Sequence, residues 1–231
     1  MPIPILSYHS ISDENCPLSL NISEFEKQLI YFKNKNFESV FFNEIGDNKK
    51  KQFIITFDDG YKDLIENSLP LLKKYNFKAT CYIVSNFIGK TNIWDENFKN
   101  IKKKKLMDKA DIKLWIDNGM KIGSHSKNHK KMQDLDQNEI NNEVLGSKNY
   151  LEDLTGNLVD SFCYPYGYYN NSIIQEVKKN YSFGLSTIRS RYKKNKHEKY
   201  LLPRIDMGKK LSKFKLFLKI NTPYEDLKYD R

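Results

Sequence analysis

The sequence has few arginines, and this shortage limits what its charge can mean. Lys and Arg number 39 against 29 Asp and Glu, a net charge of +10, but only four of the cations are Arg. Proteins that read nucleic acid rely on Arg for bidentate contacts, so a surplus of Lys argues against a nucleic-acid partner. We interpret the surplus as a solvated surface, with attraction to an anionic membrane or substrate as the alternative.

Cysteines and long apolar runs are also scarce. Three scattered cysteines, Cys16, Cys81 and Cys163, show no Cys-x-x-Cys spacing, and so indicate neither a disulfide framework nor a cysteine zinc site. No run reaches the ~20 apolar residues of a membrane-spanning helix, and residues 1–16 lack the pattern of a signal peptide. We expect one domain over residues 1–231, a monomer located in the cytoplasm, with peripheral membrane contact left open.

Strand-like and helix-like segments alternate along nearly the whole chain. Strands are expected at 3–9, 37–42, 52–57, 78–84, 120–124, 159–165, 182–187 and 200–207. Helices are expected at 23–36, 62–76, 108–118, 136–155, 170–180 and 209–219. Residues 86–107 interrupt the alternation as a loop or short-helix insertion. Seven or eight strands separated by helices imply a parallel sheet, either doubly wound or closed into a barrel.

Polar residues at the ends of these strands favour the barrel. They are His9, Asp58–Asp59, His125 and Pro165–Gly167. In a parallel barrel, catalytic residues gather at the C-terminal ends of the strands. We therefore predict an α/β fold, a distorted parallel (β/α) barrel.

Asp58 and Asp59 place two like charges side by side at the end of a buried strand. Neighbouring strand side chains point to opposite faces, but Gly60 permits backbone angles that turn both carboxylates toward one site. A cation beside them would remove their repulsion. The pair therefore indicates a metal.

Two further segments could complete such a site. His125 and His129 stand four apart, a spacing that lets both imidazoles reach one ion, although surface or capping roles are the alternative. No Glu follows His125, which argues against a metalloprotease of the His-Glu-x-x-His type. The aromatic turn "FCYPYGYYN" (162–170) is either a packed turn or the floor of a sugar-binding groove, with backbone N–H groups suited to an oxyanion.

Together these motifs resemble a known family. TFDDG (56–60), HSxxH (125–129) and PYG (165–167), in this order, are similar to motifs of the polysaccharide deacetylases, the NodB-homology domains of the fourth carbohydrate esterase family. The resemblance covers residues 3 to about 207. It implies a distorted β/α barrel and a hydrolase that removes N-acetyl groups from amino sugars.

The resemblance also implies roles for individual residues. Asp58 would be the general base, while Asp59, His125 and His129 would hold a divalent metal, usually zinc in this family. Three protein ligands leave positions open for water and substrate, as a catalytic site requires. The turn Pro165–Tyr166–Gly167 would help to hold the oxyanion.

Two motifs of the family are missing from their usual places. Cys163 stands where the family carries an Arg, and no Leu-x-His follows late in the chain. "ILSYHSI" resembles the first strand of the circularly permuted poly-N-acetylglucosamine deacetylases, which makes His9 the general acid, with a core histidine as the alternative. Arg204 in "LPRID" would replace the missing Arg, and its partner is either Asp58 or Asp206.

Two lysine-rich segments leave alternatives open. Lys102–Lys105 are expected to be a solvated stretch, or else to meet the phosphate of a lipid-linked sugar. Residues 211–220 interleave Lys with Leu and Phe, which predicts a helix packed on the barrel rather than one lying on a membrane.

We expect a zinc-dependent N-deacetylase of amino sugars in a bacterial surface glycan or its precursor. The alternatives are a deformylase or deacetylase of a lipid-linked monosaccharide, a non-catalytic glycan-binding barrel and an iron oxygenase. The oxygenase is disfavoured because Asp59 lies far upstream of the two histidines. A groove open at both ends would favour a polymeric substrate, and a pocket roofed by residues 86–107 a smaller one.

Overall fold

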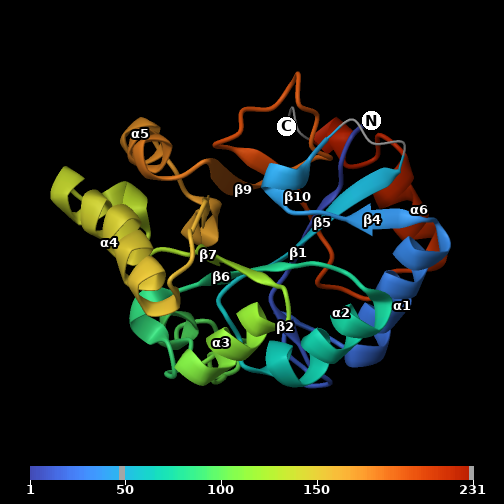
Figure 1. Cartoon of the computed structure of the whole chain (residues 1–231), viewed down its shortest axis with the longest axis horizontal. Helices are drawn as coiled ribbons and strands as arrows, with labels where there is room; N and C mark the ends of the chain where they lie inside the picture. The colour runs from blue at the N-terminus through green and yellow to red at the C-terminus, as the bar shows by residue number, and fades with distance from the viewer. Residues whose placement is uncertain (47–49, 229–231) are drawn as a thin grey trace.

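The computed structural model describes residues 1–46 and 50–228. Seven parallel strands close a barrel because β1 pairs with both β10 and β5, and β4 adds to the outside of β5 (Figure 1). The strands, in their order around the barrel, are β1 (Ile5–Tyr8), β10 (Leu202–Asp206), β9 (Phe183–Arg189), β8 (Ser161–Cys163), β7 (Lys121–Ser124), β6 (Thr80–Ile83) and β5 (Lys51–Phe57), and the added strand is β4 (Phe37–Ser39). The predicted α/β barrel in a single domain is confirmed.

The α-helices of the described residues lie around the strands (Figure 1). They are α1 (Ile22–Asn34), α2 (Leu69–Tyr75), α3 (Lys109–Asp117), α4 (Gln137–Thr155), α5 (Asn171–Asn180) and α6 (Lys213–Asn221). Strand β5 is buried from Gln52 to Phe57, as expected for a strand of a parallel sheet that is covered on both faces. None of the helices among the described residues is long and apolar enough to cross a membrane.

The first, second and last helices differ from the prediction. In place of one helix over 62–76, a π-helical segment, Leu64–Ser68, precedes α2. Helix α1 starts at Ile22 because the Asn21 side chain accepts a hydrogen bond from the backbone N–H of Ser23. Helix α6 begins at Lys213, four residues later than predicted, because Ser212 caps it. Leu216 and Ile220 of α6 pack on the core, as predicted.

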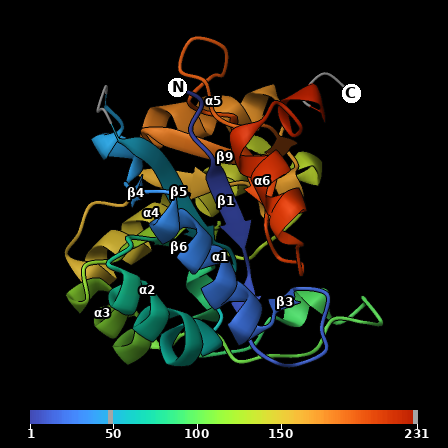
Figure 2. The same ribbon diagram turned by 90° about the vertical axis from the view of Figure 1, so that its right-hand side faces the viewer.

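Two short strands were not predicted. They are β2 (Ser10–Ile11) and β3 (Ser19–Leu20), which pair with each other just after β1 ends. A two-residue strand has no periodicity to detect, so only its pairing in space defines it. Figure 2 shows β3 beside the lower end of β1, next to the segment that contains residues 86–107.

The interpretation of Lys102–Lys105 as a solvated stretch is wrong for Lys104. Its side chain is only 9% exposed, and its Nζ lies 2.6 Å from Asp63 Oδ2, 2.6 Å from Ser10 Oγ and 2.8 Å from Ser12 Oγ. Lys103 is exposed, and among the described residues it pairs only with Glu96, also exposed, at 3.2 Å. Lys104 therefore ties residues 86–107 to β2, immediately after His9.

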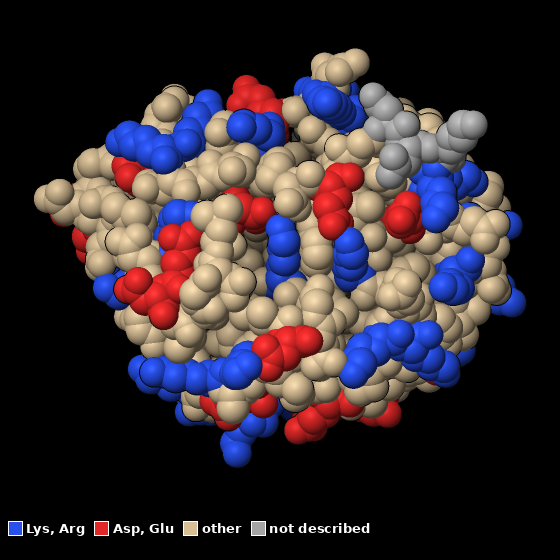
Figure 3. Space-filling view, in the orientation of Figure 1, with Lys and Arg blue, Asp and Glu red and all other residues tan. Residues whose placement is uncertain are grey.

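Charges of both signs are interspersed over the face of the molecule in Figure 3. Such mixing agrees with the interpretation of the lysine surplus as a solvated surface on this face.

Replacing Lys104 with Met should destabilise the protein by about 2–4 kcal/mol, because Asp63 would keep a poorly solvated charge without its partner. The matched control is Lys103→Met, at the neighbouring lysine of the same segment. Its free energy of unfolding should stay within about 0.5 kcal/mol of that of the parent protein. Urea unfolding of the three proteins measures both changes. Equal losses in the two variants would contradict the structural role given to Lys104.

Candidate active site

Asp58 directly follows β5 and forms a buried ion pair with Arg204 of β10. Arg204 Nη1 lies 2.7 Å from Asp58 Oδ1, and its Nη2 lies 2.8 Å from Oδ2. Arg204 Nε donates to the Ser186 carbonyl, and its Nη2 also contacts Cys163 Sγ at 3.2 Å. Burial would raise the pKa of Asp58, but the charge and hydrogen bonds of Arg204 outweigh it and hold that pKa below its ordinary value.

Of the two partners considered for Arg204, the structure brings Asp58 to it. Asp206 is exposed, and its Oδ1 accepts a hydrogen bond from Gly208 N. Cys163, at the position where the family usually carries its Arg, contacts the same guanidinium.

Asp59 faces the two histidines instead. Its Oδ1 lies 3.4 Å from Nε2 of His125 and 3.4 Å from Nε2 of His129. All three side chains are buried, and Asp59 Oδ1 has no hydrogen-bond partner among the described residues. Burial opposes ionisation of Asp59, yet the two imidazoles hold its pKa well below the usual range.

Neighbouring groups fix the orientation of the histidines. His125 Nδ1 lies 2.8 Å from the Cys163 carbonyl oxygen, which can only accept, so in the neutral ring Nδ1 carries the proton and Nε2 keeps its lone pair. Buried Glu143 of α4 accepts hydrogen bonds from the backbone N–H groups of Lys127 and Asn128, at 3.0 and 2.8 Å. Glu143 thus holds the loop between the two histidines, a role that no local pattern indicates.

The backbone is strained where these side chains meet. Six non-glycine residues among those described have positive φ, and four of them belong to the motifs: Asp59 (70°), Ser126 (63°), His129 (55°) and Tyr166 (56°). Such conformations cost about 1–3 kcal/mol each and concentrate at functional sites. Gly60, which the sequence predicts to adopt unusual backbone angles, does have a positive φ, and Asp59 itself is also left-handed.

The residues present fit a divalent metal ion. One ligand atom from each of Asp59, His125 and His129 lies within 4.8 Å of the other two, and the orphaned Asp59 oxygen faces both imidazole nitrogens. One carboxylate and two imidazoles are a donor set that zinc accepts while keeping a position open.

A second group, Asp58, His125 and Cys163, also lies close together. It fits a metal less well, because both oxygens of Asp58 are engaged by Arg204 and His125 Nδ1 is engaged by the Cys163 carbonyl. Burial also raises the pKa of the Cys163 thiol, which disfavours the thiolate that a metal would need.

The turn Pro165–Gly167 closes the site on the side of β8 and β9. Tyr166 packs edge-on against the ring of His129, with centroids 4.5 Å apart. Gly167 has φ +74°, and a Cβ there would meet Thr187 Oγ1 at 2.0 Å, so this position requires glycine.

A cavity of about 200 Å³ connects these groups at the C-terminal ends of the strands. Eight of the nine predicted site residues line it: His9, Asp58, Asp59, His125, His129, Tyr166, Gly167 and Arg204. Pro165 is buried and does not line it. His9, at the end of β1, therefore shares a cavity with Asp58 although they are far apart in the chain.

Residues 86–107 form one wall of this cavity through Trp94, Asp95, Phe98 and Ile101. The Trp94 ring stacks on His129 at a centroid distance of 4.6 Å. The sequence predicts an insertion here that could roof a pocket, but it assigns none of the segment's side chains to the site. The aromatic residues and the acid within "NIWDENF" were the available signal.

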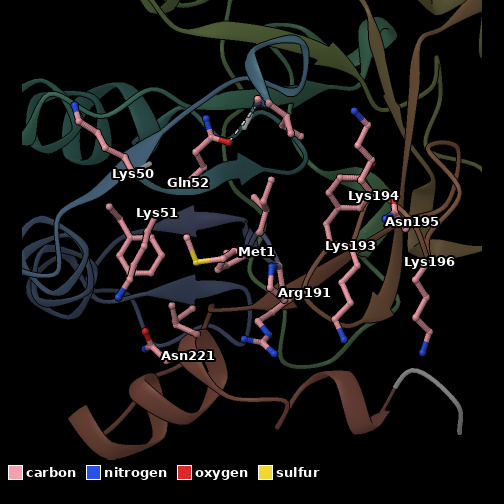
Figure 4. A pocket seen from close by; sticks show the side chains of 18 of the residues that line it. Met1, Lys50, Lys51, Gln52, Arg191, Lys193, Lys194, Asn195, Lys196 and Asn221 are labelled. Carbon is pink, nitrogen blue, oxygen red and sulfur yellow. Dashed lines mark hydrogen bonds between the residues drawn. The ribbon is translucent and has the colours of Figure 1, made fainter. Parts of the chain in front are cut away.

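A larger cavity of about 1060 Å³ lies at the opposite end of the barrel, beside the start of β1 and β5 (Figure 4). Lysines flank it on two sides, with Met1 between them, and Arg191 and Lys193 pair with Asp226. Its lining, among the described residues, includes no Asp, Glu, His or Cys. The described lining of this larger cavity therefore offers neither the carboxylates nor the imidazoles that the smaller cavity brings together.

The Asp-His-His group and the buried Asp–Arg pair both lie at the C-terminal end of the parallel barrel, where the active sites of such barrels gather. The profile of the polysaccharide deacetylase family matches residues 45–182, more than half of the chain, and the chain belongs to that family. The matched segment contains Asp58, Asp59, His125 and His129, while His9 and Arg204 lie outside it.

Curated relatives extend the similarity beyond that segment. YxkH of Bacillus subtilis is 29% identical over 194 residues, which are 80% of this chain and 64% of that protein. The poly-β-1,6-N-acetyl-D-glucosamine N-deacetylase of Staphylococcus epidermidis is 28% identical over 212 residues, 87% of this chain and 72% of that protein. The chain thus spans about two thirds of these relatives.

A solved structure shares the fold over almost the whole chain. The deacetylase PplD of Streptococcus pyogenes superimposes with a TM-score of 0.81 at 23% identity, covering 96% of this chain and 99% of that one.

Replacing Asp59 with Asn should abolish stoichiometric zinc binding, because it removes the anionic ligand of the Asp-His-His group. The matched control is Asp58→Asn, the same change one residue away, which should retain zinc. Metal content after dialysis, measured by mass spectrometry, distinguishes them. Loss of zinc from Asp58→Asn with retention in Asp59→Asn would place the metal in the group with Cys163 instead.

Proposed function

We propose that this protein is a zinc-dependent hydrolase that removes the N-acetyl group from an amino sugar of a bacterial surface glycan or its precursor. One observation carries the proposal: Asp58 paired with Arg204, the Asp59–His125–His129 group and His9 line a single cavity. Membership of the polysaccharide deacetylase family and the similarity to a poly-N-acetylglucosamine N-deacetylase support the substrate class.

Asp59, His125 and His129 would hold the metal ion. When bound there, a divalent ion polarises the acetamide carbonyl and lowers the pKa of a water molecule.

Asp58 acts as the general base. Because Arg204 keeps its pKa low, the carboxylate is ionised and can accept a proton from the water that attacks the acetamide carbon. Arg204 also fixes both oxygens of Asp58, and so acts as a positioning residue.

His9 acts as the general acid. It lines the cavity and has no hydrogen bond to any described residue, so its ring is available to substrate. It protonates the sugar nitrogen as the carbon–nitrogen bond breaks, which releases acetate and a free amine. In the Pro165–Tyr166–Gly167 turn, the backbone N–H of Tyr166 stabilises the developing oxyanion, because Pro165 has no N–H and the N–H of Gly167 donates to the Tyr164 carbonyl.

The dimensions of the cavity favour one sugar unit at a time. At about 200 Å³ it is smaller than typical pockets for drug-sized ligands, roughly 300–1,000 Å³. Residues 86–107 wall it on one side, which favours a chain end or a small lipid-linked sugar over the middle of a long polymer.

The test is acetate release from N-acetylglucosamine oligomers and from a polyprenyl-phosphate N-acetylhexosamine. Each is assayed with added zinc, after chelation, and with His9→Ala. We expect release that needs zinc and falls about 10²–10⁴-fold in His9→Ala, the usual contribution of a general acid. His9→Ala should keep its zinc, which separates loss of the acid from loss of the metal.

Zinc-bound protein that releases no acetate from any acetylated sugar would overturn the deacetylase proposal. Formate release from N-formyl sugars would then indicate a deformylase, and sugar binding without hydrolysis a glycan-binding barrel. The substrate from which acetate is released faster shows whether the protein acts on a polymer or on a lipid-linked sugar.

Arg204→Met should reduce kcat at least 10²-fold and destabilise the protein by about 3–5 kcal/mol, because it leaves Asp58 buried without its partner. The double variant Arg204→Met with Asp58→Asn should recover part of the stability but none of the activity. Thermal unfolding and initial rates measure the two effects. Full activity of the Arg204→Met variant would contradict the catalytic role given to the Asp58–Arg204 pair.

A further inference from the structure

One buried acid of the cavity takes no part in the steps above. Asp95 follows Trp94 in the 86–107 segment, lines the cavity and is 5% exposed. No Lys, Arg or His among the described residues forms an ion pair with it. A buried carboxylate without a cationic partner is costly, so its surroundings call for an explanation.

The two oxygens of Asp95 differ in their surroundings. Oδ2 accepts a hydrogen bond from Asn92 Nδ2 at 3.0 Å and lies 3.5 Å from the Tyr61 hydroxyl, and neither of these residues lines the cavity. Oδ1 has no hydrogen bond from any residue that the structure describes. Oδ2 is thus held by hydrogen bonds within the protein, and Oδ1 is available to accept a hydrogen bond from a ligand in the cavity.

The segment that carries Asp95 is fixed in place. Asn92 is buried and bridges Asp95, the Lys102 carbonyl at 3.2 Å and the Lys104 backbone N–H at 2.6 Å. Trp94, next to Asp95, stacks on His129. Asp95 is therefore held next to the metal-binding group, as recognition of a substrate requires.

We infer that Asp95 is a substrate-binding residue that accepts a hydrogen bond from a hydroxyl group of the amino sugar. This inference rests on the proposed function. An N-acetylated sugar offers two kinds of donor, its hydroxyls and its amide N–H, and the amide belongs at the reacting centre. Trp94, Phe98 and Ile101 line the cavity beside Asp95 and offer apolar surface to the sugar ring. Burial raises the pKa of Asp95 to about 6, so it is mostly ionised at neutral pH and acts as an acceptor.

Asp95→Asn tests this role with little change of shape. Asn92 Nδ2 and the Tyr61 hydroxyl would draw the amide oxygen of Asn to the Oδ2 position, which turns its NH₂ group toward the cavity. The variant therefore presents a donor where the protein presents an acceptor. Glu96→Gln is the matched control, because Glu96 is exposed and pairs with Lys103.

The experiment uses zinc-loaded protein with N-acetylglucosamine oligomers whose terminal residue is the parent sugar or its 3-, 4- or 6-deoxy form. KM and kcat are measured for each substrate. Affinity is measured by calorimetry in an Asp58→Asn background, where turnover is blocked. For the parent sugar, Asp95→Asn should raise KM and Kd about 10- to 100-fold, as expected for a hydrogen bond to a charged group, with kcat within about threefold.

One deoxy sugar, the form lacking the recognised hydroxyl, should bind equally to the parent protein and to Asp95→Asn. Unchanged KM and Kd in Asp95→Asn, an equal loss for all four sugars, or a fall in kcat alone would each overturn the inference while leaving the deacetylase proposal intact. If the zinc-loaded protein neither binds nor hydrolyses any of the four sugars, the proposed function fails and the inference fails with it.

Discussion

The buried ion pair between Asp58 and Arg204 determines which partners remain for the carboxylate of Asp59. Strand β5 delivers two adjacent acids to the same buried end of the barrel, where both would repel each other and lose hydration. Arg204 compensates the charge of Asp58 with two short hydrogen bonds. Among the described residues, it makes no hydrogen bond to Asp59. Asp59 instead faces two imidazole nitrogens, and the proposed roles of Asp58 as base and Asp59 as metal ligand depend on this separation.

Contacts elsewhere in the barrel keep Asp58 and Asp59 with their separate partners. Asp59, His129 and Tyr166 adopt left-handed backbone angles, whose cost is offset by the packed core beneath them. Glu143 and the Cys163 carbonyl fix the two histidines from α4 and β8. Lys104 ties the 86–107 segment to the short strand that follows His9. A preorganised site of this kind needs little rearrangement when substrate binds.

The sequence predicts the fold and most of the cavity because both depend on local patterns. Strands and helices alternate visibly, and their polar ends meet wherever parallel strands close into a barrel. Arg204 is predicted because the resembling family has an Arg that is missing from its usual place here and because a charge at the end of an apolar strand needs a partner, although its choice of Asp58 over Asp206 required the structure. Glu143, Lys104 and Asp95 were missed because their partners lie about 15 to 95 residues away or depend on how a loop folds. No period or motif marks such contacts.

The most direct test of this account is a crystal structure of the protein with zinc bound. We predict one ion about 2.0–2.2 Å from Asp59 and from Nε2 of both His125 and His129, with Asp58 still paired to Arg204. An ion ligated by Asp58 or by the Cys163 sulfur, with Arg204 displaced, would contradict the separate roles of the two aspartates.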